Sequence, residues 1–95
     1  MLDKKLLLEK VKKKSEVYFT FIYGEDFALA RCENNQIDYI VFNEMGIPCA
    51  IRQGYMDINQ FLKEDNNIQP TKLVDYVDLK TFSSLYQQAK DNMYS

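Results

Sequence analysis

The chain has 95 residues, of which 46% are hydrophobic and 27% charged, a composition that fits one globular domain and excludes a disordered or low-complexity chain. It contains no histidine, which excludes histidine-based catalytic triads and histidine-ligated metal sites. The formal net charge is −2, but six lysines against two acids give residues 1–14 a charge of +4, so the remaining residues carry −6.

Residues 1–14 predict a basic amphipathic helix. At about 100° per residue, Leu7 and Val11 fall on one arc of the helix, and three lysines lie on the other side. Exposed lysines neutralise phosphate charge without reading base sequence, although a solvated helix face has the same pattern. The candidate nucleic-acid contacts are therefore Lys5, Lys12 and Lys13.

From residue 16 the apolar pattern takes a period of two, which predicts antiparallel strands over 16–53. The pair Asn34-Asn35 tolerates positive φ and predicts a two-residue hairpin turn. That turn sets Arg31 opposite Asp38 as an ion pair, and places two phenylalanines opposite each other as an aromatic pair. The aromatic pair is Phe27 with Phe42.

Both faces of this hairpin are apolar. A sheet with one face in water would alternate cleanly between apolar and polar residues, so helices or another molecule must cover each side. One face holds Phe27, Leu29, Ile40 and Phe42, and the other holds Ala28, Ala30, Cys32, Ile37, Tyr39 and Val41.

Two later segments share the pattern Y-Φ-D-Φ-x-x-F, where Φ is apolar. Asp57 and Asp78 are helix N-cap candidates, and capping explains both carboxylates without a catalytic or metal-binding role. They predict a short helix at 57–64 and a longer one at 78–93, with a strand at 71–77 between them. The sequence therefore predicts one α+β domain over 1–95, an antiparallel meander of four to five strands packed by an N-terminal, a middle and a C-terminal helix.

The longest nearly apolar run, 17–23, is far shorter than the roughly 20 residues that cross a bilayer. Cys32 and Cys49 lack a redox or metal spacing, so we interpret them as reduced thiols on strands too far apart for a disulfide. These features favour a cytoplasmic protein with no membrane contact.

The sequence contains no glycine-rich phosphate loop, no serine nucleophile elbow and no calcium-loop pattern. We therefore predict no catalytic residue, no bound metal and no cofactor. The richness in lysine, asparagine, isoleucine and tyrosine is typical of an AT-rich coding source, such as a low-GC bacterium or its phage.

A two-faced sheet with few helices to cover it predicts an exposed apolar remainder, which marks an interface. We expect a small protein-binding protein that modulates or inhibits a larger protein, with a homodimer as a further partner hypothesis. The alternatives are a nucleic-acid-contacting accessory protein that uses the lysine-rich helix, and an acidic nucleic-acid mimic that uses the acids of 57–78. Tyrosine and arginine are enriched at interfaces, so the candidate partner contacts are Tyr18, Tyr39, Tyr55, Tyr76, Arg31 and Arg52.

Overall fold

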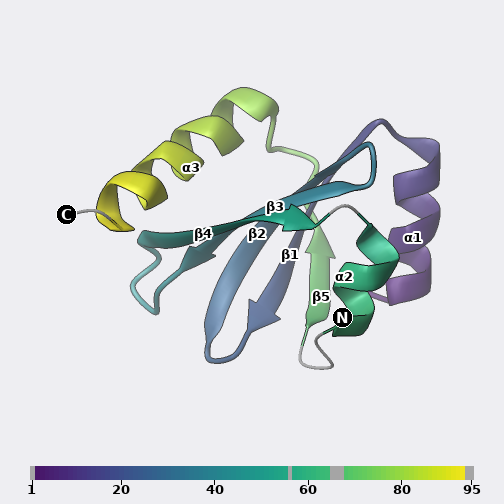
Figure 1. The fold of residues 1–95 in the computed structure, drawn as a ribbon, viewed down its shortest axis with the longest axis horizontal. Helices are drawn as coiled ribbons and strands as arrows, with labels where there is room; N and C mark the ends of the chain where they lie inside the picture. The colour runs from purple at the N-terminus through teal and green to yellow at the C-terminus, as the bar shows by residue number, and fades with distance from the viewer. Residues whose placement is uncertain (1, 56, 65–67, 94–95) are drawn as a thin grey trace.

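The computed structural model describes residues 2–55, 57–64 and 68–93, without the side chains of 53–55 and 64. The five strands form one antiparallel sheet in the order β4-β3-β2-β1-β5 (Figure 1), which confirms the predicted α+β fold. The elements in chain order are α1 (Lys4–Lys13), β1 (Glu16–Tyr23), β2 (Asp26–Glu33), β3 (Gln36–Phe42), β4 (Pro48–Tyr55), α2 (Ile58–Glu64), β5 (Gln69–Leu73) and α3 (Leu79–Met93).

The β2–β3 hairpin has the register that the sequence predicts. Asn34 and Asn35 adopt φ of 51° and 64°, the left-handed conformation that a two-residue turn of this kind requires. Phe27 lies opposite Phe42, and their ring centroids are 5.7 Å apart. The predicted aromatic pair is confirmed.

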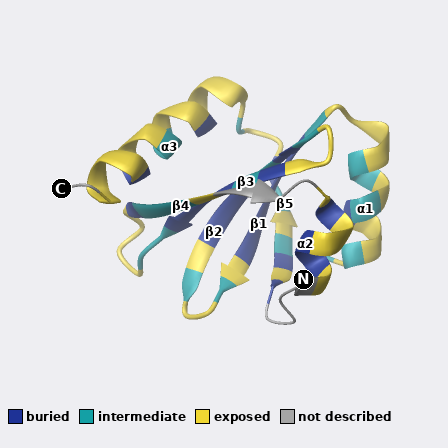
Figure 2. Cartoon of the chain, viewed as in Figure 1, coloured by how far each residue is buried: buried dark blue, intermediate teal, exposed yellow. Residues whose placement is uncertain are grey.

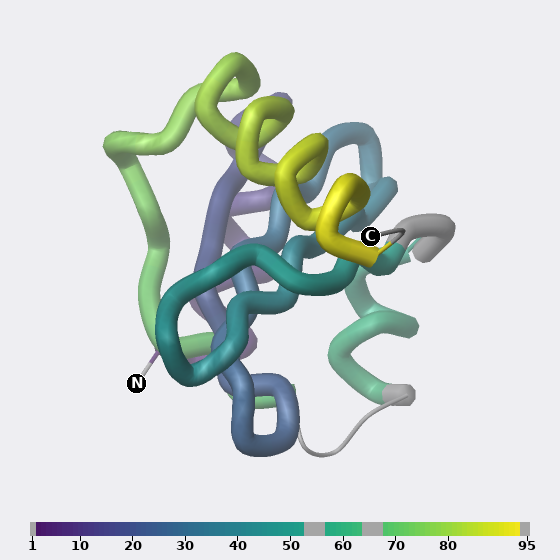
Figure 3. The backbone as a smooth tube through the Cα atoms, turned by 90° about the vertical axis from the view of Figure 1, so that its left-hand side faces the viewer, coloured from purple at the N-terminus to yellow at the C-terminus, as the bar shows by residue number. Residues whose placement is uncertain are grey.

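The edge strand β5 starts earlier and is shorter than the predicted strand at 71–77. It pairs with β1 from Gln69 to Leu73, and the register shifts by one residue in the middle of this pairing. The amide of Val74 still donates to the carbonyl of Tyr18 at 2.9 Å, after which the chain leaves the sheet towards α3 (Figure 3). The alternation beyond residue 74 therefore belongs to a crossover segment and not to a strand.

Aromatic rings fill the face of the sheet on which α1 and α2 lie, and Figure 1 shows the position of these two helices. The Phe21 ring lies 5.1 Å from the Tyr39 ring and 5.6 Å from the Phe61 ring of α2, measured between centroids. Leu7 of α1 is fully buried in the same cluster. The N-terminal helix and the middle helix thus close this face.

The other face is covered by α3 alone. Phe82 and Ala89 of α3 are buried against Tyr18, Leu29 and Ile40 of the sheet. Helix α3 packs mainly on β4 and β3, so it crosses the sheet towards one edge (Figure 1). Both faces are therefore covered by helices of the chain itself, as the pattern requires, but the second face has less cover.

The two repeated aspartates are helix caps. Oδ1 of Asp57 accepts a hydrogen bond from the Asn59 amide, and Oδ1 of Asp78 accepts one from the Thr81 amide, both at 2.8 Å. The latter bond lowers the pKa of Asp78, because it favours the charged carboxylate. The shared sequence pattern is thus accounted for by two helix starts.

Replacing the ring that joins α2 to the sheet tests this packing. Phe61→Ala leaves a cavity between three aromatic rings, so we expect the free energy of unfolding to fall by about 3–5 kcal/mol. Urea denaturation measures the change, with Leu79→Ala as the control because Leu79 is 49% exposed. A loss of under about 1 kcal/mol would show that α2 does not hold this face.

Candidate functional site

Two of the candidate contact tyrosines lie in the core. Tyr18 is 7% exposed and Tyr39 is 2% exposed. Tyr39 packs between Phe21 and Phe61, and Tyr18 packs against Phe82 of α3. The expectation that these rings offer contact area to a partner is therefore corrected, because α2 lies over Tyr39 and α3 lies over Tyr18.

The remaining candidates do not form one surface. Tyr76 is exposed on the crossover between β5 and α3, whereas Arg52 is exposed on β4, at the opposite edge of the sheet. The Arg52 guanidinium donates to the Ile51 carbonyl at 3.0 Å. The side chain of Tyr55 lies outside the described residues. The tyrosine and arginine candidates are thus not brought together.

Arg31 belongs to a charged cluster at the start of β1 and the end of β2. Its Nε donates to Glu16 at 3.2 Å, its Nη2 donates to Glu33, and the Tyr18 hydroxyl also donates to Glu16. Asp38 lies directly opposite in the register but forms no ion pair with Arg31, so the predicted pair is wrong. Glu33 is on the same strand face and Glu16 is on the neighbouring strand, and these two carboxylates take up the guanidinium.

The groups in and near this cluster are held in their ordinary neutral-pH protonation states. Burial and the bond to Glu16 raise the pKa of Tyr18 to about 12. The bonds from Tyr18 and Arg31 lower the pKa of Glu16. Burial raises the pKa of the Cys32 thiol to about 11, which makes it a poor nucleophile. Near neutral pH, Tyr18 and Cys32 are therefore protonated and Glu16 is ionised.

No metal centre is assembled in the described part of the chain, where no three side chains of cysteine, aspartate or glutamate gather closely enough to bind an ion. Cys32 and Cys49 are free thiols on strands β2 and β4, which are separated by β3. The prediction that they form no disulfide is confirmed.

The three candidate lysines of α1, Lys5, Lys12 and Lys13, are all exposed. Lys12 and Lys13 stand in the last helical turn, where positive charge is favourable because the helix dipole is negative there. Their placement is explained by helix stability as fully as by a phosphate contact.

A cleft of about 400 Å³ lies between the end of α1, the start of β1 and the crossover to α3. Lys10 and Lys14 line one side, and Glu16, Asp75 and Asp78 line it with opposite charge. Glu16 and Asp78 are engaged by Arg31 and by the α3 cap. Because this lining carries both positive and negative side chains, it does not indicate one class of ligand.

Both edges of the sheet are partly blocked. On β4, the Ile51 amide donates to the Met93 sulfur at 3.3 Å, and the Asn92 side chain donates to the Pro48 carbonyl at 2.6 Å. On β5, the Leu2 amide donates to the Pro70 carbonyl at 3.0 Å, where the N-terminal segment lies beside the strand (Figure 3). Edge strands that are occupied in this way resist pairing with another chain.

One apolar surface is only partly covered by α3. Ile22, Phe27 and Phe42 lie side by side across β1, β2 and β3, and we call these three residues the apolar row. Ile22 is 44% exposed and Phe27 is 46% exposed, beside the β1–β2 turn, where the ribbon is exposed or half-buried (Figure 2). Phe42 is half-buried and packs against the cluster under α3, whose C-terminal turn bonds to Pro48 opposite Phe42. The adjoining β3–β4 turn adds two further exposed apolar side chains. These are Met45 and Ile47.

Sequence reasoning placed Phe27 and Phe42 on one apolar face but did not single them out as a site. The signal was present, because that face needs cover along its whole length and only one long helix is available for it. The part of the face that stays open depends on where α3 crosses the sheet. The apolar pattern of residues 79–93 predicts a helix but not its position over the sheet.

No family model, curated protein or solved structure matches this chain. Among the described residues, no helix combines the length and the apolar character needed to cross a membrane. We call the end of the sheet that carries the apolar row the open end, because Ile22 and Phe27 are paired there and both are nearly half exposed.

The half-buried carboxylate of Asp38 gives a pH-dependent prediction. Burial raises its pKa, and Arg31 only partly opposes this, so the charged form is less favourable in the folded state than in the unfolded state. Asp38→Asn should therefore raise the Tm at pH 7 by a few degrees. The gain should disappear as the pH falls below the ordinary carboxyl value of 3.8, where Asp38 is protonated in both states.

Thermal unfolding followed by circular dichroism from pH 3 to pH 7 checks this, with the exposed Asp75→Asn as the control. A lower Tm for Asp38→Asn at pH 7 would show instead that attraction to Arg31 outweighs the cost of burial.

Proposed function

We propose that this protein is a small protein-binding module that modulates or inhibits a larger protein by covering part of its surface with the open end of the sheet. The observation that supports this is the apolar row, in which large side chains from three adjacent strands meet and two of them, Ile22 and Phe27, stay nearly half exposed. Single exposed apolar residues are ordinary on protein surfaces, whereas a contiguous group marks an interaction site.

The energetics require more contact than the row alone supplies. Full burial of an isoleucine or phenylalanine side chain contributes about 1.5–3 kcal/mol, and these side chains are already half buried. The row therefore supplies only a few kcal/mol, while a specific interface covers about 800 Å² per partner. We expect the interface to extend over the β3–β4 turn, where Met45 and Ile47 are exposed.

Action by occupancy fits the side-chain chemistry described above. The charged cluster holds Tyr18 protonated and Glu16 ionised, and it leaves no group poised to exchange a proton near pH 7. The two free thiols, Cys32 and Cys49, favour a reducing compartment such as the cytoplasm.

The experiment compares baits that differ only in the apolar row. Ile22→Thr/Phe27→Thr keeps strand-forming residues but removes the apolar area. We expect the wild-type protein to retain a stoichiometric protein from nuclease-treated host lysate, and the double variant to bind that protein at least about 30-fold more weakly, equivalent to about 2 kcal/mol at an interface centre. Quantitative mass spectrometry and then calorimetry with the purified partner measure the loss.

The matched control is Leu79→Gln, since Leu79 is as exposed as Phe27 but lies at the start of α3. It should bind like the wild type. Unchanged binding by the double variant, with its thermal unfolding also unchanged, would rule out the open end as the interface.

The lysine-rich helix provides the competing test. Charge reversal at Lys5, Lys12 and Lys13 should leave capture of the protein partner unchanged, since α1 packs on the other face of the sheet. If this triple variant loses binding while the double variant keeps it, α1 is the interface. Recovery of nucleic acid without nuclease, with an affinity that falls steeply with salt, would then identify the ligand.

A further inference from the structure

The turns that border the apolar row carry negative charge. Glu25 and Asp26 lie in and beside the β1–β2 turn, next to the paired residues Ile22 and Phe27. Glu44 lies in the β3–β4 turn, two residues after Phe42, and both glutamates are exposed. Neither 17–30 nor 39–51 contains a lysine or an arginine. The open end thus combines an apolar centre with an acidic border.

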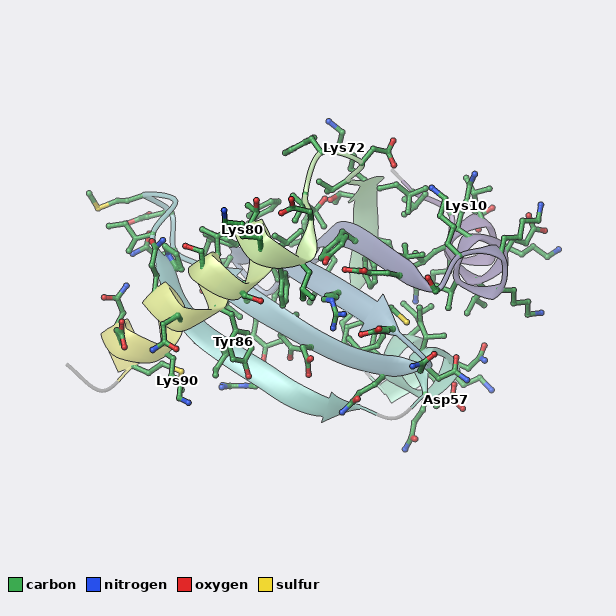
Figure 4. The ribbon with its side chains drawn as sticks, turned by 90° about the horizontal axis from the view of Figure 1, so that it is seen from above. Lys10, Asp57, Lys72, Lys80, Tyr86 and Lys90 are labelled. Atoms are coloured by element: carbon green, nitrogen blue, oxygen red, sulfur yellow. The ribbon has the colours of Figure 1, made fainter. Side chains whose placement is uncertain are left out.

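Two basic residues, Lys72 and Lys90, stand on β5 and α3. Lys72 of β5 is in register with Thr20, two residues before Ile22 on β1. Lys90 lies on the same side of α3 as Tyr86 (Figure 4), whose pKa is raised by burial and by the nearby Asp38. Among the described residues, neither lysine forms an ion pair with Glu25, Asp26 or Glu44.

We propose that the open end receives a different protein, whose binding segment carries apolar side chains flanked by lysine or arginine, and not a second copy of this chain. This inference rests on the proposed function of the apolar row. In a two-fold dimer the same patch meets itself, so each copy would bring Glu25, Asp26 and Glu44 to one border. Like charges that meet at an interface oppose association, whereas a basic border complements this one.

The charges of Glu25, Asp26 and Glu44 act only over a short range in salt solution. The screening length at physiological ionic strength is about 8 Å, so acids directly beside the patch contribute more than the net charge of the molecule. The lysines of α1 lie beyond the other face of the sheet (Figure 1) and do not alter this border.

Two synthetic peptides test the charge preference directly. Both contain the same leucine- and phenylalanine-rich core, and one is flanked by three lysines on each side while the other is flanked by three glutamates. In ¹⁵N–¹H NMR titrations we expect the lysine-flanked peptide to shift the amide signals of Ile22, Phe27 and Phe42 and to bind at least 10-fold more tightly. Glu25→Gln/Glu44→Gln should remove most of that difference, whereas Glu9→Gln on α1 should not. Equal binding of the two peptides, or no shift with either, overturns the inference.

The oligomeric state tests the exclusion of a second copy. Light scattering at 200 μM should give the mass of one chain, 11.2 kDa. A dimer that Phe27→Thr dissociates would overturn the inference.

The two proposals can fail separately. If the native partner binds Ile22→Thr/Phe27→Thr normally, the proposed function fails. If only the charge preference is absent, the open end keeps its role and the stated chemistry of the partner is wrong.

Discussion

The structure depends on one constraint, which is that β1 is apolar on both of its faces. Every residue from Val17 to Phe21 is buried, and successive side chains of a strand point to opposite sides of the sheet. A strand of this kind is stable only if both faces are covered. The chain has three helices for this task, and it places α1 and α2 on one face and α3 alone on the other (Figure 1). The unequal cover of the two faces follows from this division.

The two ends of the face under α3 differ in their chemistry. At one end Arg31, whose side chain is 14% exposed, is neutralised by Glu16 and Glu33 and is thereby satisfied within the chain. At the other end Ile22 and Phe27 remain nearly half exposed, and another molecule is needed to bury them further. Apolar side chains beyond the reach of α3 lower solubility and contribute little to folding. The proposed binding role would account for their presence, and the proposed partner with a basic border would account for the acidic turns beside them.

Local signals predicted the local structure. Two asparagines that accept positive φ set the register of the β2–β3 hairpin, and two aspartates that accept backbone hydrogen bonds set the starts of α2 and α3. The errors arose where distant segments compete or pack. Arg31 pairs with Glu16 because β1 brings that carboxylate beside it, which the hairpin alone does not report. The apolar row escaped prediction as a site for the same reason, since the position of α3 over the sheet is a property of packing between segments far apart in sequence.

The most direct test of the account is a hydrogen–deuterium exchange footprint of the protein bound to its captured partner. Binding at the open end predicts slower exchange in peptides that cover 20–29 and 40–48, with little change in peptides that cover 4–14 and 76–84. These segments include the apolar row and the two acidic turns in the first case, and α1 and the start of α3 in the second. Protection confined to 4–14, with the open end unchanged, would contradict the account and make the basic helix the binding surface.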